Sequence, residues 1–363
     1  MSFRTKRVIF STPFYMLFQF FLFKYLFLFF GGLDDVYLII LSVFIGFIRI
    51  VPMFFEARKS RSITRFLAKV DGIWMWASVM LLIDIVILYL IASFYKLPLE
   101  VISLSLVIIL ILGIYNYYNS YNLVVNEKVL KIKDLNQEIN IAHLSDVHFG
   151  SVRHDEIIEK IAFKLRQLED TCKLAIISGD LADGSSVIKE DDFMALSNVD
   201  MPIIFTPGNH DFYMGIDNVI KACKKAGVIV LNNSSFKFEN LNIYGLTFSF
   251  GDRKMPEIKK DIIDSDALNI LNYHVPYYWE EFSDLGFDIQ LSGHTHGGQF
   301  YPAVFFSNLI FKYNKGLFKN EYGKYLNVTT GVGCMDISMR WGTKSEINVL
   351  KLEPLRLVEA GDS

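Results

Sequence analysis

Long apolar stretches dominate the first third of the chain. Four of them approach the ~20 residues that a helix needs to span a bilayer, and they cover residues 8–30, 36–55, 72–95 and 98–118. The first stretch is too long for a cleavable signal peptide, and no small-residue cleavage site precedes Gly31. We therefore expect residues 1–120 to form a four-helix transmembrane region.

The charges between these stretches predict their orientation. Basic residues gather at the N-terminus and in the connection between the second and third stretch, namely Arg4, Lys6, Arg7, Arg58, Lys59, Arg61, Arg65 and Lys69. The other two connections, "GGLDD" and "YKLPLE", are short. Because basic loops stay in the cytoplasm, we expect an inner-membrane protein whose remaining residues return to the cytoplasm.

Three charged residues fall inside the apolar stretches: Lys24, Arg49 and Asp84. Such residues are candidates for a transport path. At ~1.5 Å per residue, Lys24 and Asp84 lie at depths that differ by about 6 Å. We expect them to form a structural ion pair, with Arg49 extending its charge to the membrane surface. No stretch is interrupted by paired Gly or Pro, as transporter sites often are.

Beyond residue 121 the pattern changes to short elements. Residues 122–132 alternate like a strand, residues 139–150 read as a strand that runs into a loop, and residues 155–170 have helical spacing. Further apolar runs end in polar or glycine-rich turns and predict strands within 172–180, 201–211, 228–235, 241–248, 267–276, 287–296 and 324–333. This order predicts an α/β fold, with a linker and first strand in 121–137, a domain in 138–354 and a tail in 355–363.

Polar residues collect at the ends of these strands, where ligand sites gather in open α/β sheets. Five of the seven histidines occur in this set. The set comprises Asp146, His148, Asp180, Asp183, Asn209, His210, Asp211, His274, His294 and His296. The other two histidines have plainer interpretations, because His143 lies within a strand and His154 opens a surface helix.

The spacing within this set suits metal ions. In extended backbone, residues i and i+2 point the same way about 6.6 Å apart. Asp146 with His148, and His294 with His296, can therefore each serve two metals spaced ~3.5–4 Å apart. Nearby glycines let the backbone come close, and a carboxylate such as Asp180 can bridge two cations with its two oxygens. Mixed oxygen and imidazole donors favour two divalent transition metals, Mn, Fe or Zn.

Charge and cysteine content narrow the remaining classes. Residues 1–120 contain 11 Lys/Arg against 6 Asp/Glu, whereas residues 121–363 contain 25 against 33. An acidic C-terminal part without a basic run argues against nucleic acid as a partner. Cys172, Cys223 and Cys334 are far apart and lack CxxC spacing. We expect them to be small buried side chains rather than disulfides or a zinc site.

The motifs "DVH", "GDLAD", "GNHD", "YH" and "GHTHGGQ" occur in this order. With them the chain resembles the calcineurin-like metallophosphoesterase superfamily over roughly residues 138–352. The apolar helices ahead of these motifs make it similar to the branch called transmembrane protein with metallophosphoesterase domain. The resemblance implies a four-layer αββα sandwich, in which helices flank two facing sheets. The chain departs from the pattern before Glu346, where relatives tend to have proline and this chain has Lys344 and Ser345.

The resemblance also implies a role for each matching position. One metal is expected on Asp146, His148, Asp180 and His296, and the other on Asp180, Asn209, His274 and His294. The implied mechanism is in-line attack on phosphorus by a metal-activated hydroxide. His210 resembles the non-ligand histidine that protonates the leaving oxygen or stabilises the transition state, and Asp183 or Asp211 is expected to orient it.

Together these features predict a membrane-anchored phosphoesterase whose partners are the lipid bilayer and a phosphorylated, membrane-associated substrate. Relatives in this branch are often linked to hydrolysis of UDP-2,3-diacylglucosamine in lipid A synthesis, which is an analogy of family only. A protein or cyclic-nucleotide phosphoesterase is a second interpretation. A non-catalytic membrane sensor that binds metal is a third, and the complete ligand set argues against it.

An apolar run, "GQFYPAVFFSNLIF", follows the last histidine pair. It begins within one residue of a predicted ligand, so it starts at the mouth of the site. One interpretation is a core-filling helix or strand. The other is an apolar lip that enters the inner leaflet or receives acyl chains, each buried CH₂ contributing ~0.8 kcal/mol. Residues Phe305 and Phe306 distinguish the two interpretations.

Overall fold

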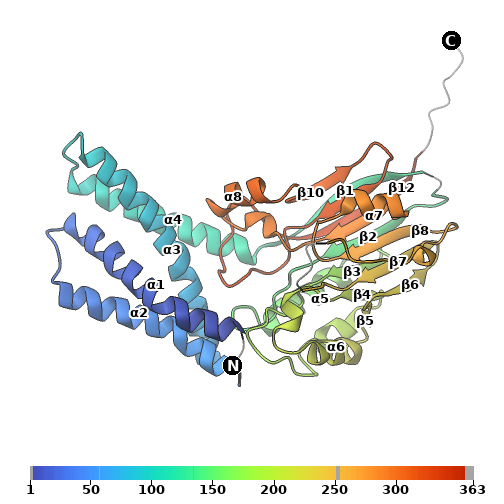
Figure 1. Ribbon diagram of the computed structural model, residues 1–363, viewed down its shortest axis with the longest axis horizontal. Helices are drawn as coiled ribbons and strands as arrows, with labels where there is room; N and C mark the ends of the chain where they lie inside the picture. Colours follow the sequence, from blue (N-terminus) through green and yellow to red (C-terminus); the bar gives the residue numbers. More distant parts are fainter. Residues whose placement is uncertain (1–2, 57, 134, 251–253, 356–363) are drawn as a thin grey trace, which may run out of the picture.

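Four long helices make up the N-terminal part of the computed structural model, which describes residues 3–56, 58–133, 135–250 and 254–355 (Figure 1). They are α1 (Phe3–Leu28), α2 (Asp35–Glu56), α3 (Ser62–Ala92) and α4 (Leu99–Tyr121). All four are long and apolar enough to cross a membrane, which agrees with the four predicted apolar stretches. Most of the predicted tail, residues 356–363, lies outside the described residues.

Helix α3 begins well before the apolar stretch that predicted it. It has 31 residues, which at ~1.5 Å per residue makes it longer than the ~30 Å hydrocarbon core of a bilayer. Its first turns are polar, with the sequence "SITRFLAK". The polar residues continue the same helix beyond the membrane core, so the apolar pattern alone placed its start too late.

The charged residues of the spans pair differently from the prediction. Lys24 Nζ lies 3.0 Å from Asp35 Oδ2 at the start of α2, and Asp84 accepts a hydrogen bond from a serine of α4. Arg49 Nη1 lies 3.7 Å from Asp71 Oδ2 of α3. The predicted Lys24–Asp84 pair and the predicted surface position of the Arg49 charge are therefore wrong. Depth in the membrane does not determine which helix face a side chain occupies.

Two six-stranded sheets face one another in the C-terminal part (Figure 1). The first has the order β1 (Leu123–Ile132), β12 (Ser345–Pro354), β2 (Ile139–Leu144), β3 (Leu174–Ser178), β4 (Ile203–Thr206) and β5 (Ile229–Val230). The second has the order β10 (Gly316–Lys319), β11 (Tyr325–Val328), β9 (Ile289–Ser292), β8 (Leu268–Tyr273), β7 (Leu241–Leu246) and β6 (Ser234–Phe238). Their inner faces meet in one apolar cluster that contains Ile141, Leu174, Ile243 and Ile270.

Helices cover the outer faces of both sheets. On the first sheet, α5 (Asp155–Arg166) and α6 (Ile216–Lys225) pack Ile161 and Val219 into a cluster with Phe205 of β4. On the second sheet, α7 (Trp279–Leu285) packs Phe282 against Leu271 of β8. This arrangement confirms the predicted four-layer αββα sandwich behind a four-helix region.

Every predicted strand is present, because inner strands of this kind are buried on both faces and read as continuous apolar runs. The pattern missed β12 and the two edge strands of the second sheet, β6 and β10. The side chains of β6 and β10 are half-buried or exposed, so these two strands lack an apolar run. The three cysteines are free and buried, as predicted.

The C-terminal part packs directly on the ends of the membrane helices. Trp76 and Met80 of α3 share an apolar cluster with Phe300 and Met339. At the end of α4, the side-chain amide of Asn119 donates hydrogen bonds to two main-chain carbonyls in the segment that precedes β12. The loop that leads away from the "GHTHGGQ" motif is therefore anchored on a membrane span.

Candidate metal centre

All seven residues predicted as metal ligands lie just beyond the C-terminal ends of strands. Two follow β2, one follows β3, one follows β4, one follows β8 and two follow β9; in that order they are Asp146, His148, Asp180, Asn209, His274, His294 and His296. These ends meet at one edge of the two sheets. Most of the side chains are buried there, while His294 and His210 are partly exposed and mark the open side of the centre.

Possible metal-binding atoms come within 4.8 Å of one another in three overlapping groups. The groups are Asp146–His148–His296, His148–Asp180–His210 and Asp180–His274–His294. The first and third contain most of each predicted ligand set. The second adds His210, which was predicted to be a neighbour of the metals rather than a ligand.

The first group has the geometry of a cation site. His148 Nε2 lies 3.0 Å from His296 Nε2, and His296 Nε2 lies 3.4 Å from Asp146 Oδ1. Asp146 Oδ1 is buried and has no hydrogen-bond partner among the described residues. Two imidazole nitrogens and a carboxylate oxygen that converge in this way are satisfied by a cation between them better than by one another.

The third group, Asp180–His274–His294, is built in the same way. His274 Nε2 lies 3.1 Å from Asp180 Oδ2 and 3.2 Å from His294 Nδ1. The amide oxygen of Asn209 lies 3.1 Å from that same His294 nitrogen. The four predicted ligands of the second metal are thus neighbours in the structure.

Asp180 lies between the histidines of the first group and those of the third group. Its Oδ2 is 3.1 Å from His274 Nε2 of one group and 4.0 Å from His148 Nε2 of the other. Its Oδ1 accepts a hydrogen bond from the main-chain N–H of His210 at 2.8 Å. One carboxylate oxygen, rather than one oxygen for each metal as predicted, therefore faces both groups.

Five of the seven predicted ligands have a left-handed backbone. Their φ angles are positive, at 51° for Asp146, 50° for His148, 53° for Asp180, 72° for His294 and 49° for His296. Positive φ is uncommon in residues other than glycine and clusters at functional sites. The extended i, i+2 geometry predicted for the two pairs is therefore wrong. The side chains converge because the chain reverses sharply at each strand end.

Two glycines allow these loops to approach each other. A Cβ atom at Gly208 would lie 2.3 Å from Asp180 Oδ1, and one at Gly293 would lie 2.2 Å from Asp146 Oδ2. Both distances are impossible for real atoms. The glycines of "GNHD" and "SGHTH" are thus required so that a metal-binding carboxylate can pass close to a neighbouring loop.

Burial and neighbouring charges both shift the pKa values of the residues in this centre. Burial favours the neutral imidazoles of His294 and His296 and lowers their pKa values to about 4 and about 3. Burial acts in the same direction on His274, but the Asp180 carboxylate outweighs it and raises the pKa of His274 to about 9. Burial alone would raise the pKa of Asp146, but His296 and the neighbouring imidazoles hold it well below its usual value. Ionised carboxylates and neutral imidazoles are the forms that bind metal.

His210 is positioned by the main chain. Its Nδ1 lies 2.9 Å from the main-chain carbonyl oxygen of Asp183, so a proton on Nδ1 is donated to that oxygen and Nε2 is left for the site. Its ring is perpendicular to that of His148, with 4.8 Å between centroids. Asp183 therefore orients His210 as predicted, but through its carbonyl group. The Asp183 carboxylate accepts hydrogen bonds from the main-chain N–H groups of Ser151 and Ser185.

Asp211 has a structural role that the prediction missed. Its carboxylate accepts hydrogen bonds from the main-chain N–H groups of Asp180, Ala182 and Gly208, at 2.8–2.9 Å. Burial, together with Asp180, raises its pKa to about 7. Of the two residues expected to orient His210, Asp183 is thus the one that contacts its ring, while both carboxylate oxygens of Asp211 hold the backbone of two ligand loops.

Arg340 is a further residue that the sequence did not single out. It is fully buried, and its Nη2 donates to the carbonyl groups of Thr330, Gly331 and Gly333 at 2.6–3.1 Å. The Gly333 N–H in turn donates to the carbonyl of Asp146 at 2.7 Å. Arg340 therefore holds the loop that closes over Asp146. A lone arginine in a polar segment gives no sequence signal of such burial.

The apolar run after the last histidines forms η4 (His296–Gly298) and helix α8 (Ala303–Ile310). Within α8, Val304 is buried, whereas Phe305, Phe306, Leu309 and Ile310 are each more than half exposed. The core-filling interpretation thus accounts for one side of α8 only. At the end of the helix, the Phe311 ring lies 6.2 Å from the ring of His294.

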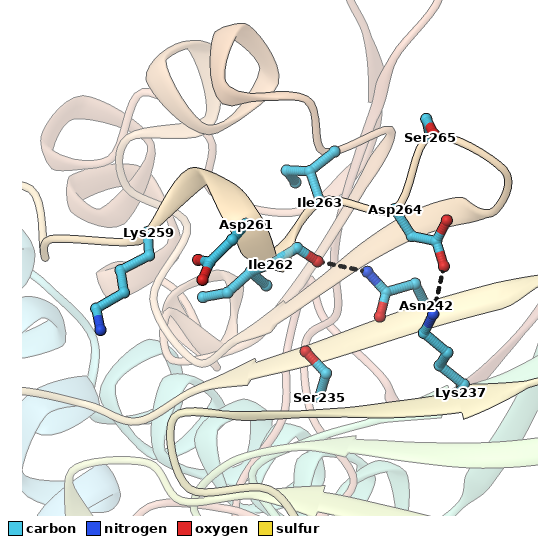
Figure 2. Close-up of a pocket in the computed structure, with 9 residues that line it drawn as sticks. All are labelled: Ser235, Lys237, Asn242, Lys259, Asp261, Ile262, Ile263, Asp264 and Ser265. Atoms are coloured by element: carbon cyan, nitrogen blue, oxygen red, sulfur yellow. Dashed lines mark hydrogen bonds and ion pairs between the residues drawn. The ribbon is translucent and has the colours of Figure 1, made fainter.

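A cavity of about 500 Å³ lies elsewhere, on the outer part of the second sheet (Figure 2). Its polar groups satisfy one another, since Lys237 pairs with Asp264 at 2.6 Å and Asn242 donates to the carbonyl of Ile262 at 2.8 Å. It contains none of the predicted site residues. The chemistry of the donor atoms, rather than this cavity, identifies the functional site.

Residues 139–298 match the family model described as calcineurin-like phosphoesterase. A metallophosphoesterase of Campylobacter jejuni is 30% identical over 279 residues, which cover 71% of this chain and 72% of the relative. A metallophosphoesterase of Helicobacter pylori is 28% identical over 238 residues and 63% of this chain. The chain spans 64% of the length of that relative.

Two further similarities are more distant. A transmembrane protein with metallophosphoesterase domain from Danio rerio is 25% identical over 273 residues, which cover 69% of this chain and 62% of the relative. Among solved structures, the NAD nucleotidase of Haemophilus influenzae matches 55% of this chain and 46% of its own, with a TM-score of 0.37 and 15% identity. The clustered donor atoms and the family match both indicate that this site binds divalent metal ions.

Proposed function

The chain belongs to the calcineurin-like phosphoesterase family, and from this premise we propose that it hydrolyses a phosphate ester or pyrophosphate bond in a membrane-associated substrate. The observation that carries the proposal is the pair of donor groups joined at Asp180. Two divalent cations held there, Mn, Fe or Zn by the nitrogen and oxygen donors, would polarise a phosphoryl group and lower the pKa of water.

The chain's own residues prepare the site for this reaction. The carbonyl of Asp183 fixes the ring of His210, so Nε2 is held toward His148 and is available to give a proton to a leaving oxygen. Asp211 holds the backbone of two loops that carry ligands, and Arg340 holds the loop that closes over Asp146. Because the centre is open near His294 and His210, we expect the phosphate to enter from that side.

Helix α8 supports a substrate that is held at the membrane. Its exposed residues Phe305, Phe306, Leu309 and Ile310 form one apolar surface, which begins near a membrane span because Phe300 packs on Trp76. In Figure 1, α8 lies on the side of the C-terminal part that faces the membrane helices. Such a surface can enter the headgroup region of a bilayer while Phe311 at its end borders His294. A lipid-linked phosphate would then reach the metals without leaving the membrane surface.

This proposal is tested with two substrates and one double variant. Phe305→Ser with Phe306→Ser is compared with Phe163→Ser, a control that removes an equally exposed phenylalanine from α5. We expect kcat/KM of the double variant to fall roughly tenfold or more for an acylated substrate and to hold for a small aryl phosphodiester. Equal loss on both substrates would return α8 to a structural role and favour a soluble substrate, such as a phosphoprotein or cyclic nucleotide.

UDP-2,3-diacylglucosamine, the lipid A precursor associated with this branch, combines two acyl chains with a pyrophosphate and is the first acylated substrate to assay. Release of a uridine nucleotide by the purified chain with Mn²⁺ is the expected result. Activity on the aryl phosphodiester without activity on this compound would support the proposed phosphoesterase reaction but show that the natural substrate is a different compound. Absence of both activities in the metal-loaded protein would favour a metal-binding sensor instead.

We also propose that the catalytic part faces the cytoplasm from the inner membrane. The basic connection between α2 and α3 lies on the same side of the four helices as the C-terminal part, and basic loops remain in the cytoplasm. A reporter that is active only in the periplasm should be silent when fused after Ser363 and active when inserted at Gly32, in the connection between α1 and α2. The reverse result would invert the topology.

A further inference from the structure

A cavity of about 230 Å³ lies where the last membrane helix meets the C-terminal part. It is lined by Tyr121, Arg153, His154, Glu156, Ile157 and Lys160. Tyr121 ends α4, and the other residues surround the start of α5. The loop before α5 carries Asp146 and His148, so the cavity lies between a membrane span and a metal-binding loop. Its lining has two basic side chains, Arg153 and Lys160, one carboxylate, Glu156, and one histidine.

Arg153 has an unusual environment for a charged residue. It is 5% exposed and forms no ion pair with any described residue. Its Nη2 donates to the carbonyl of Ser120 at 2.7 Å, and its guanidinium lies 3.5 Å from the centroid of the Tyr121 ring. Its Nε has no hydrogen-bond partner within the described part of the chain. A buried cation without a counter-ion is costly, and the contact with an aromatic ring offsets only part of that cost.

The positive charge of the cavity is only partly offset by its one carboxylate, Glu156. Lys160 Nζ donates to the main-chain carbonyl of Tyr121. Burial, and then the charges of Arg153 and Lys164, lower the pKa of Lys160 despite the opposing effect of Glu156. The hydroxyl group of Tyr121 is also buried and lacks a partner among the described residues. The side chains of Arg153, Lys160 and Tyr121 therefore line a space large enough for a hydrated anion, since one water takes up ~30 Å³.

The cavity lies at the end of the last membrane helix, because its lining residue Tyr121 is the last residue of α4. Tyr115 and Tyr118 are exposed on α4, as expected for aromatic residues that mark the boundary between membrane and water. Tyr121 lies one turn further, about 4.5 Å along the axis. Lys69 of α3 adds its Nζ at 5.5 Å from the Tyr121 ring. The cavity thus lies one turn beyond the exposed tyrosines of α4, where lipid headgroups are expected.

We propose that this cavity binds the phosphate group of an anionic membrane lipid, with Arg153 and Lys160 as its cationic partners. Basic pockets beside membrane helices recognise anionic headgroups in this way, and charge-assisted hydrogen bonds to phosphate satisfy a buried guanidinium. A bound headgroup would fix the end of α4 against α5 and so hold the metal-binding loop at a defined height above the bilayer. This site does not depend on which bond the metal centre hydrolyses.

The experiment uses the full chain in nanodiscs and measures the thermal unfolding midpoint and the lipids retained in native mass spectrometry. The three conditions are phosphatidylcholine alone, phosphatidylcholine with phosphatidylglycerol, and phosphatidylcholine with inorganic phosphate in solution. The variant Lys160→Gln removes one cation of the cavity while a hydrogen-bond donor remains. The variant Lys164→Gln removes a cation one turn further along α5, outside the cavity lining.

We expect phosphatidylglycerol to raise the unfolding midpoint of the wild type and to be retained on the protein. Lys160→Gln should weaken its apparent affinity roughly tenfold, and Lys164→Gln should leave it unchanged. If inorganic phosphate alone stabilised the wild type and this effect were lost in Lys160→Gln, the cavity would be a site for free phosphate and the assignment to a lipid headgroup would be wrong. Equal weakening by both variants, or no stabilisation under either condition, would overturn the site. Phosphate that bound at the metal centre instead would raise the unfolding midpoints of Lys160→Gln and Lys164→Gln equally. The readouts are independent of hydrolysis, so failure of the proposed reaction is a separate result.

Discussion

His148 and His296 face each other through their Nε2 atoms at 3.0 Å, although they are 148 residues apart in the chain. Both are buried. At most one of the two nitrogens can donate a hydrogen bond to the other, and the adjacent Asp146 Oδ1 accepts none from the described residues. The fold thus keeps a set of lone pairs together that only a cation satisfies in full, and the stability of the protein should depend on that cation.

Removal of metal should therefore destabilise the chain. A ligand that binds only the folded state adds about 2.7 kcal/mol at a concentration 100 times its dissociation constant. We expect EDTA to lower the unfolding midpoint of the detergent-solubilised protein and Mn²⁺ to restore it. His148→Ala should abolish this difference, whereas His154→Ala, which alters a histidine at the start of α5 outside the three donor groups, should retain it. An unfolding midpoint that is the same with and without EDTA would contradict the prediction.

Asp180→Asn should remove metal from both groups, because the carboxylate lies between His274 and His148. Asparagine preserves the volume but lacks the negative charge that offsets two cations. We expect elemental analysis to find less than one metal per chain and hydrolysis to be lost. Asp264→Asn, which breaks a surface ion pair with Lys237, is the matched control. Two tightly bound metals in Asp180→Asn would refute the bridging role.

His210→Ala should lower turnover without emptying the site. A lost general acid typically costs 10²–10⁴-fold, and the predicted metal ligands remain. Elemental analysis and turnover on an aryl phosphodiester are measured on the same sample. The structure groups His210 with His148 and Asp180, so His210 could be either a metal ligand or a general acid. The metal content of the variant distinguishes these two roles. Loss of metal would make His210 a ligand and remove it from the proton transfer.

The sequence was sufficient to predict which residues meet, because strand ends are readable from apolar runs. Asp180 follows "LAIIS" and His294 follows "IQLSG", and parallel strands deliver such residues to a single edge. The local conformation was not predictable. The left-handed backbone at Asp146 and His296 is imposed by contacts with other loops, such as the hydrogen bond from Gly333 to Asp146. Propensity in the sequence carries no record of such contacts.

The buried charged residues that hold the loops could not be predicted from the sequence either. Arg340 and Asp211 are charged residues in polar segments, which ordinarily suggests a solvated surface. Both are buried because they satisfy main-chain groups, Asp211 those of the ligand loops and Arg340 those of the loop over Asp146. In the membrane region, the depth of Lys24 was readable but its helix face was not. The partner of a charge is decided by packing between helices, which a hydrophobic pattern does not encode.

Trp76 should couple the membrane helices to the metal centre. Its indole is buried between α3 and the C-terminal part, in one cluster with Phe300 and Met339. Phe300 lies four residues after the predicted ligand His296. Trp76→Ala would leave a cavity under this loop and should cost about 3–5 kcal/mol of stability, and the loosened loop should bind Mn²⁺ more weakly in a calorimetric titration. Trp76→Phe, which keeps part of the contact, provides a folded intermediate if the alanine variant does not fold.

The matched control is Trp74→Ala in the same helix. The Trp74 ring stacks on Phe23 of α1 at 5.7 Å between centroids, and its indole N–H donates to Gln19 at 3.1 Å. Its removal should destabilise the packing of the spans by a similar amount while the affinity for Mn²⁺ is unchanged. If both tryptophan variants lowered metal affinity equally, the effect would reflect general loosening of the protein. A difference confined to position 76 would show that a membrane span supports the loop that carries His296.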